Sequence, residues 1–334
     1  MATGIVSIAA YLEQMETIAW MLFILNIGAY IVLWAITIMR LIWFLPSILA
    51  DLRSHSRGPA LLTAVAATCI LGNQFLVLGG QVTPAVWLLG FGAALWVCIM
   101  YAFFAAITVH DAKPDLEGGL NGGWLLTVVS TQAVALLGTM IASHMGSMRD
   151  QLTFVALCLF LVGCMLYILV ISLIFYRWTF FRLMPAALTP PYWINMGAVA
   201  ITTRVGATLA ASPSHSPFLH DILPFLKGFT LFFWATGTWW IPLLVILTVW
   251  RHLSKIPVRY DPQYWGMVFP LGMYTVCTYQ LSRMTGMPFL DVIPRLFVFV
   301  AIGAWAVTFA AMVHSVVAKA LASIGLVQHA NGAT

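Results

Sequence analysis

Long apolar segments fill almost the whole chain, and none of them carries an acidic residue near its middle. Hydrophobic residues make up 62% of the sequence, charged residues only 7%, and the mean hydropathy is +0.97. A soluble domain carries about 25% charged residues, so this chain is suited to a lipid bilayer. Because intramembrane carboxylates usually serve proton relays and cation paths, their absence favours a path for neutral or negatively charged solutes.

Nine segments are long enough to cross the bilayer core, which takes about 20 apolar residues. They cover residues 17–41, 59–80, 84–109, 122–144, 152–178, 191–211, 222–252, 262–283 and 291–316. Continuous apolar runs lack the alternation of a membrane barrel strand, so we expect an all-α integral membrane protein. We expect residues 1–318 to form a single transmembrane domain and residues 319–334 a short cytoplasmic tail.

The opening stretch, Met1 to Leu12, is apolar but only about half a span long. Of the fifteen Lys and Arg residues, ten lie on one side of the membrane if this stretch counts as the first of ten spans. The excess of basic residues predicts that both termini are cytoplasmic, which requires an even number of spans. We therefore expect ten transmembrane helices, the first of them truncated.

Little in the sequence indicates an enzyme, a cofactor or a nucleic-acid partner. The five cysteines lie within apolar segments, and the eight histidines lie in loops, tails or segment ends. Paired carboxylates, a nucleophile elbow and a zinc motif are absent from the sequence. The basic residues are scattered over short loops and form no patch for nucleic acid. We expect no catalytic site, no metal and no cofactor.

The segments differ systematically when the opening stretch is counted as the first. Odd-numbered segments carry small and polar residues, such as Gln132 in the fifth and Asn195 and Thr202 in the seventh. Even-numbered segments read as lipid-facing. The alternation predicts five helical hairpins with the polar members inward, lining a pore. Since small residues also let helices pack closely, a packed bundle without a conduit remains the alternative.

The ninth segment in this count, residues 262–283, contains a proline that predicts a helix kink. Phe269 precedes Pro270, and Gly272 follows two residues later. Helical spacing places Phe269, Gly272, Val276 and Gln280 on one face. A phenylalanine on such a face is able to plug a narrow pore, because hydrophobic constrictions gate by dewetting. From these residues alone, a core phenylalanine beside a structural kink is the favoured interpretation.

The seventh segment in this count, residues 191–211, contains a basic residue, Arg204, that suggests a functional role. Arg204 follows Asn195 by nine residues, which is about 180° around an ideal helix, so the two cannot line one pore unless the helix is broken. An intramembrane arginine suggests attraction of an anion. Because Arg204 lies towards one end of its segment, extension of its side chain to the interface is an equal alternative.

Four stretches together resemble one known family. They are residues 1–7 (MATGIVS), 191–197 (PYWINMG), 238–244 (TWWIPLL) and 265–272 (WGMVFPLG), spread in order over nearly the whole chain. The chain resembles the tellurite-resistance/dicarboxylate transporter family, which includes bacterial tellurite-resistance channels, fungal malate and sulfite transporters, and plant slow-type anion channels.

The resemblance implies ten helices in five hairpins with quasi-five-fold symmetry, in a homotrimer with a pore in each protomer. It implies that Phe269 gates the pore, and that Gly4, Gly197, Pro270 and Gly272 shape the inner helices. The position of Arg204 is usually apolar in such proteins, so the resemblance assigns it no role.

We accordingly expect a multi-pass protein of the bacterial inner membrane that transports small anions, whether chloride-like, malate-like or sulfite-like. An anion channel or a C4-dicarboxylate transporter is the first interpretation. A secondary carrier exporting sulfite or another oxyanion is the alternative, and a membrane scaffold without transport is a third.

Overall fold

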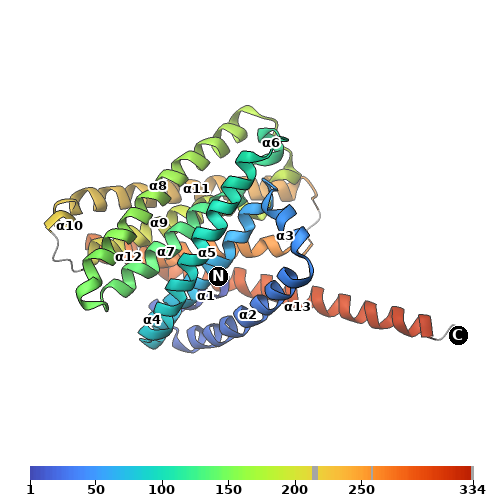
Figure 1. The fold of residues 1–334 in the computed structure, drawn as a ribbon, viewed down its shortest axis with the longest axis horizontal. Helices are drawn as coiled ribbons and strands as arrows, with labels where there is room; N and C mark the ends of the chain where they lie inside the picture. Colours follow the sequence, from blue (N-terminus) through green and yellow to red (C-terminus); the bar gives the residue numbers. More distant parts are fainter. Residues whose placement is uncertain (213–216, 257–258, 332–334) are drawn as a thin grey trace.

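The computed structural model describes residues 1–212, 217–256 and 259–331, and every regular element within them is a helix (Figure 1). Ten of the helices are the main body of the fold: α1 (Ala2–Leu12), α2 (Glu16–Trp43), α4 (Thr63–Gly79), α5 (Val82–Val109), α7 (Leu126–Ala142), α8 (Arg149–Phe180), α9 (Ile194–Ala211), α11 (Leu223–Leu253), α12 (Trp265–Thr285) and α13 (Val292–Asn331). Short helices α3 (Leu45–Leu52), α6 (Leu116–Gly119) and α10 (Pro217–Asp221) lie in the connections. The predicted all-helical fold is confirmed.

Seven helical stretches in the described residues are long and apolar enough to cross a membrane. They contain α2, α4, α5, α7, α8, α11 and α13. Helix α1 is apolar but has only 11 residues, and α9 and α12, with their polar side chains, are not in this set. Length and composition therefore support a multi-span membrane protein and leave the crossing of α1, α9 and α12 as a prediction.

The ten helices pack as five pairs around a closed ring. Contacts join α1 to α2, α4 to α5, α7 to α8, α9 to α11 and α12 to α13. The first members of the pairs contact one another in the order α1, α4, α7, α9 and α12, and α12 contacts α1 again. We call these five the inner helices and their partners the outer helices.

Burial follows the same division. In the most apolar stretch of the span that contains α7, 94% of the residues are buried. The corresponding share is 17% for each of the outer helices α2, α5 and α13. The predicted alternation of buried odd-numbered and exposed even-numbered segments is therefore confirmed. Since an outer helix returns the chain between consecutive inner helices, the inner helices run parallel to one another.

Four inner helices begin with a short 3₁₀ segment at the same end of the bundle. These segments are η1 (Gly58–Leu62), η2 (Gly122–Leu125), η5 (Pro190–Trp193) and η6 (Pro262–Tyr264). Two of them start at a side-chain cap: Asn121 accepts from Gly123 N and Asp261 from Gln263 N, both at 2.8 Å. We call this the basic end of the bundle, because the basic residues of the outer-helix ends and their loops gather there.

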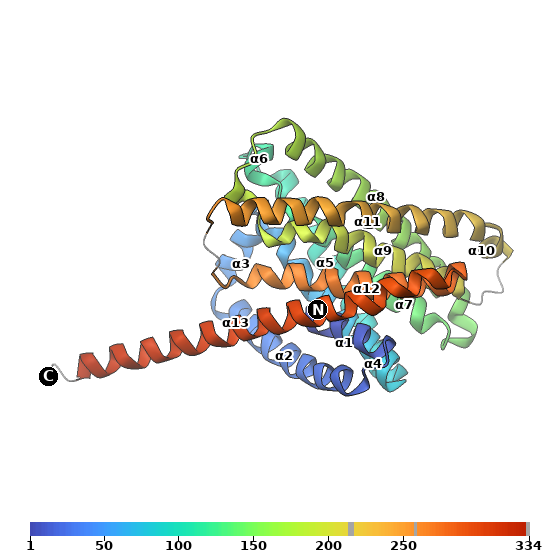
Figure 2. The ribbon, with the colours of Figure 1, turned by 180° about the vertical axis from the view of Figure 1, so that it is seen from behind.

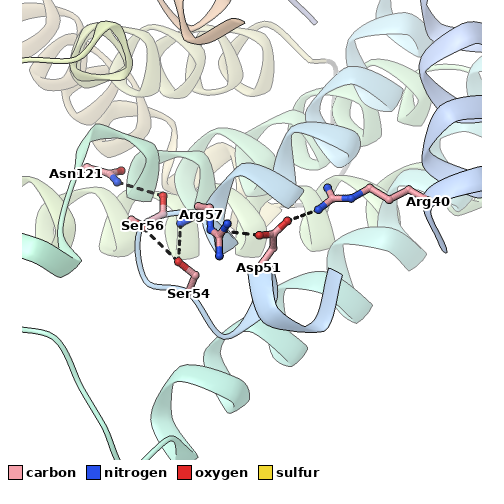
Figure 3. Close-up of polar contacts among 6 residues, drawn as sticks. All are labelled: Arg40, Asp51, Ser54, Ser56, Arg57 and Asn121. Atoms are coloured by element: carbon pink, nitrogen blue, oxygen red, sulfur yellow. Dashed lines mark hydrogen bonds and ion pairs between the residues drawn. The ribbon is translucent and has the colours of Figure 1, made fainter. Parts of the chain in front are cut away.

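A polar cluster holds the connection between the first two pairs at the basic end (Figure 3). Asp51 accepts a hydrogen bond from Arg40, and Arg57 Nε lies 3.2 Å from Asp51 Oδ1. Asn121 Nδ2, from the connection to the third pair, donates to Ser56 O at 3.2 Å. These contacts fix the loop after α3 against the start of the third pair.

A repeated hydrogen bond ties outer helices to inner ones. At four junctions an aromatic side chain of an outer helix pairs with a threonine of the next inner helix. The pairs are Tyr30–Thr68 at 2.9 Å, Trp96–Thr131 at 2.9 Å, Trp234–Thr278 at 3.0 Å and Trp305–Thr3 at 3.0 Å. A paired hydroxyl and indole N–H are cheap to place away from water, so this bond suits a membrane-embedded bundle.

Two tryptophans of α11 pack against neighbouring helices. Trp234 points inward to α12 through its bond to Thr278. Trp240 is buried, and its Nε1 donates to Tyr167 OH of α8 at 3.0 Å. Both side chains contribute to packing between helices.

The last helix runs past residue 318, where we expect the cytoplasmic tail to begin. Helix α13 continues without a break to Asn331 and extends well beyond the bundle (Figures 1 and 2). The described part of the expected tail is therefore a continuation of the last helix. At the other end of the chain, α1 contacts α2, α4, α12 and α13.

The close contact between α9 and α12 gives a stability prediction. A Cβ on Gly197 would lie 2.7 Å from Pro270 Cγ, whereas nothing lies within 4 Å of one on Gly303 of α13. Because overpacking costs about 1–3 kcal/mol, we expect Gly197→Ala to lower the Tm of the detergent-solubilised protein by several degrees. Gly303→Ala, the matched control, should leave it unchanged or raise it. Equal Tm values for the two variants would contradict this packing.

Candidate functional site

Phe269 lies on α12 with its side chain fully buried. Two nearby residues show how α12 is oriented in the ring. A Cβ on Gly272 would lie 3.0 Å from Ile5 Cγ2 of α1, and Pro270 lies directly against Gly197 of α9. Helix α12 therefore meets one ring neighbour at Gly272 and the other at Pro270.

The other side of α12 faces an outer helix. Tyr274 OH lies 2.8 Å from Thr238 Oγ1, and Trp234 Nε1 donates to Thr278 Oγ1 at 3.0 Å, both partners being on α11. Successive helical residues turn by about 100°. Phe269 therefore projects between the directions of the two ring neighbours, on the side away from Tyr274 and Thr278. This side faces the centre of the ring.

The same inner face of α12 continues towards the opposite end of the bundle. Met273 and Val276 are buried, and Gln280 is half-buried. Their spacing from Phe269 keeps them within about 40° of its direction. The face is apolar for most of its length, as a hydrophobic constriction requires. The pattern of polar residues in the sequence did not identify Met273 as part of this inner face, because a methionine in an apolar segment is indistinguishable from a core residue.

The glycines of the predicted site lie in contacts between helices. A Cβ on Gly4 would lie 2.8 Å from Ile70 Cγ2 of α4, and Gly197 and Gly272 face α12 and α1. Pro270 lies inside α12, where it removes a backbone donor. These residues let the inner helices approach one another closely. Their role in shaping a pore remains a prediction.

Gln132 points away from the centre of the ring. Its Nε2 donates to Phe160 O of the outer helix α8 at 3.1 Å, and a Cβ on Gly163 of α8 would collide with the same amide. The Gln132 Oε1 atom is buried without a partner in the described residues. The structure therefore places Gln132 in the contact between α7 and α8, and does not bring it together with Phe269.

The polar residues at the start and middle of α9 also lie away from the centre. Asn195 is buried, and neither side-chain polar atom has a partner in the described residues. It lies about 20° from the direction of Gly206, where a Cβ would meet Thr230 of α11 and Phe160 of α8. Thr202 Oγ1 donates to Ala198 O within α9 at 2.8 Å.

Arg204 lies inside the bundle and does not extend to the interface. Its side chain is 5% exposed, and its Nη1 has no partner in the described residues. It lies about 20° from the direction of Gly197, so it faces α12, where it is close enough to Cys277 to interact electrostatically. Arg204 and Asn195 therefore occupy opposite sides of α9, as their spacing predicted.

The two ends of the ring differ in charge pairing. At the opposite end, Arg283 Nη2 lies 3.7 Å from Asp291 Oδ2. Burial raises the pKa of the Glu13 carboxyl. The positive charge of the nearby Arg295 lowers it by a smaller amount, so the pKa lies above its ordinary value. At the basic end, burial lowers the pKa of the His55 side chain below its ordinary value. Cations at the basic end outnumber acids, whereas charges of both signs meet at the opposite end.

Comparison with known proteins extends over nearly the whole chain. Residues 1–313 match the family described as voltage-dependent anion channel (SLAC1). An uncharacterized membrane protein of Mycobacterium tuberculosis is 39% identical over 169 residues, 50% of this chain and 85% of that protein.

Two further relatives match over greater lengths. An uncharacterized transporter of Methanocaldococcus jannaschii is 26% identical over 92% of this chain and 88% of its own length. A sulfite efflux pump of Arthroderma benhamiae is 24% identical over 96% of this chain and 90% of its own length. The chain therefore belongs to the SLAC1 family of voltage-dependent anion channels.

Proposed function

We propose that this protein passes small anions through the centre of the ring of inner helices, with Phe269 as the gate. The observation that carries the proposal is the placement of Phe269. A fully buried aromatic side chain faces the centre of a closed ring. An apolar constriction of this kind holds a pore closed by excluding water, and movement of the ring would open it.

Electrostatics supports an anion as the solute. Four inner helices, α4, α7, α9 and α12, begin at the basic end, and the N-terminus of each carries a partial positive charge of about half an elementary charge. The surplus of Lys and Arg at that end adds to this potential. No midspan carboxylate opposes it in the sequence. Family membership points the same way.

Architecture in the membrane is part of the proposal. We infer that the ten helices form five transmembrane hairpins with quasi-five-fold symmetry, the first helix truncated, and that the protein lies in a bacterial inner membrane with both termini cytoplasmic. The closed ring and the repeated aromatic–threonine bonds support five related units. A homotrimer with one pore per protomer remains an expectation from the family resemblance.

An oxyanion carrier is the second candidate. It is favoured by the similarity to a sulfite efflux pump over almost the whole chain. A carrier saturates at high substrate concentration, whereas a channel gives currents above carrier turnover. Chloride, malate and sulfite gradients across the same membrane would separate a channel for inorganic anions, a C4-dicarboxylate transporter and an oxyanion exporter.

Removal of the gate side chain should open the path. In planar bilayers with a chloride gradient, we expect Phe269→Ala to carry an anion current at least severalfold larger than the parent protein. Phe233→Ala is the control, because Phe233 is an equally buried phenylalanine on the outer helix α11. If the Phe269→Ala current does not exceed those of the parent and the control in correctly assembled protein, the gate assignment fails.

Arg204 gives an independent prediction about selectivity. A positive charge that lies beside the conduit attracts an anion inside it, even without direct contact, when the surroundings have a low dielectric constant. In the Phe269→Ala background, we expect Arg204→Gln to lower the anion-to-cation permeability ratio by about two- to tenfold at an effective dielectric constant near 20. Arg204→Lys should preserve it. Reversal potentials that stay unchanged in both variants would assign Arg204 to packing between α9 and α12.

A further inference from the structure

A pocket at the basic end lies outside the ring and is not used by the proposed path. It has a volume of about 160 Å³ and lies between the end of α8, segment η5, the last turns of α11 and the start of α12. Its lining is mainly apolar, with Leu247 and Met267 among the side chains. Trp178, Tyr192 and Arg251 are among the residues that supply its polar groups.

Two donors in this lining are buried without an acceptor. Trp178 Nε1 and Arg251 Nε have no hydrogen-bond partner in the described residues. Arg251 is also absent from the ion pairs found there, which involve Asp51 and Asp291. A buried donor without a partner is costly, so both atoms suit a ligand that brings acceptor oxygens, and Arg251 suits one that brings negative charge.

The pocket walls are fixed in place without a ligand. Trp193 Nε1 of η5 donates to Thr248 Oγ1 of α11 at 3.2 Å. Arg177 of α8 donates to the Tyr192 hydroxyl and, at 2.7 Å, to Leu120 O. The Trp178 and Tyr192 rings lie 5.0 Å apart. The pocket is therefore preformed, which lowers the entropic cost of filling it.

We propose that this pocket binds the headgroup region of an anionic phospholipid from the adjacent leaflet. The phosphate oxygens would accept from Trp178 Nε1 and Arg251 Nε, and the apolar walls would contact the start of the acyl chains. A lipid fits better than a free anion, because most of the lining is apolar. The exposed apolar residues Ile246 and Val249 of α11 neighbour the lining residues Leu247 and Thr248 in the sequence.

Such a lipid would contact the helix that carries the gate. Met267, in the pocket lining, precedes Phe269 by two residues, and η5 leads directly into α9. Segment η5 also lies against the start of α12, since a Cβ on Gly266 would be 3.6 Å from Pro191 Cα. Lipid binding would therefore stabilise one arrangement of α9 and α12. This consequence for flux rests on the proposed gate, whereas the binding itself does not.

Binding is tested without any flux measurement. Native mass spectrometry and thermal unfolding of the detergent-purified protein would compare phosphatidylglycerol, phosphatidylcholine and inorganic phosphate. We expect phosphatidylglycerol to be retained and to raise the Tm, with little effect of phosphatidylcholine. Loss of one charge-assisted hydrogen bond should weaken retention about tenfold in Arg251→Gln, with a smaller loss in Trp178→Phe.

Arg182→Gln is the matched control, because Arg182 is an exposed arginine after the end of α8 and is not part of the pocket lining. Equal retention of phosphatidylglycerol by all three variants and the parent would overturn the proposal. Equal stabilisation by phosphate alone would identify a free-anion site and overturn the lipid assignment. Retention that holds while Phe269→Ala fails to open a path would leave the lipid site standing and remove the gate.

Discussion

Close contact between neighbouring inner helices is the constraint on which the fold depends. At Gly197 the backbone of α9 meets Pro270, at Gly272 that of α12 meets α1, and at Gly4 that of α1 meets α4. In a bilayer, helices gain little from hiding apolar surface, so close packing at small residues holds them together. The ring closes because these contacts follow one another around it, and its closure gives Phe269 a defined direction towards the centre.

The polar side chains of the inner helices point towards other helices more than into a conduit. Gln132 donates to α8, Asn195 shares the side of α9 on which Gly206 meets α8 and α11, and Arg204 lies beside Cys277 of α12. The inner face of α12 is apolar around Phe269. An anion path of this kind depends on helix ends and nearby charges for its potential and on an apolar constriction for closure.

The sequence predicted the helices and their inner or outer position but not the direction of single side chains on the inner helices. An outer helix has an apolar lipid face that is easy to recognise, whereas α7 and α9 are buried all round, so periodicity gives no direction. Gln132 and Asn195 were assigned to a pore for this reason. The bond from Trp305 to Thr3 joins residues 302 positions apart, which no local pattern in one sequence reveals. Phe269 was identified through its proline and the family resemblance, and its role as a gate is a proposal that rests on its buried position.

The most direct test asks which face of α12 lines the path. In a Phe269→Ala, Cys277→Ala background, Val276→Cys places a thiol on the inner face and Thr278→Cys places one against α11. A small negatively charged thiol reagent, added during current recording, should block the Val276→Cys protein and leave the Thr278→Cys protein conducting. Block of Thr278→Cys alone, or equal block of both, would contradict a path through the centre of the ring.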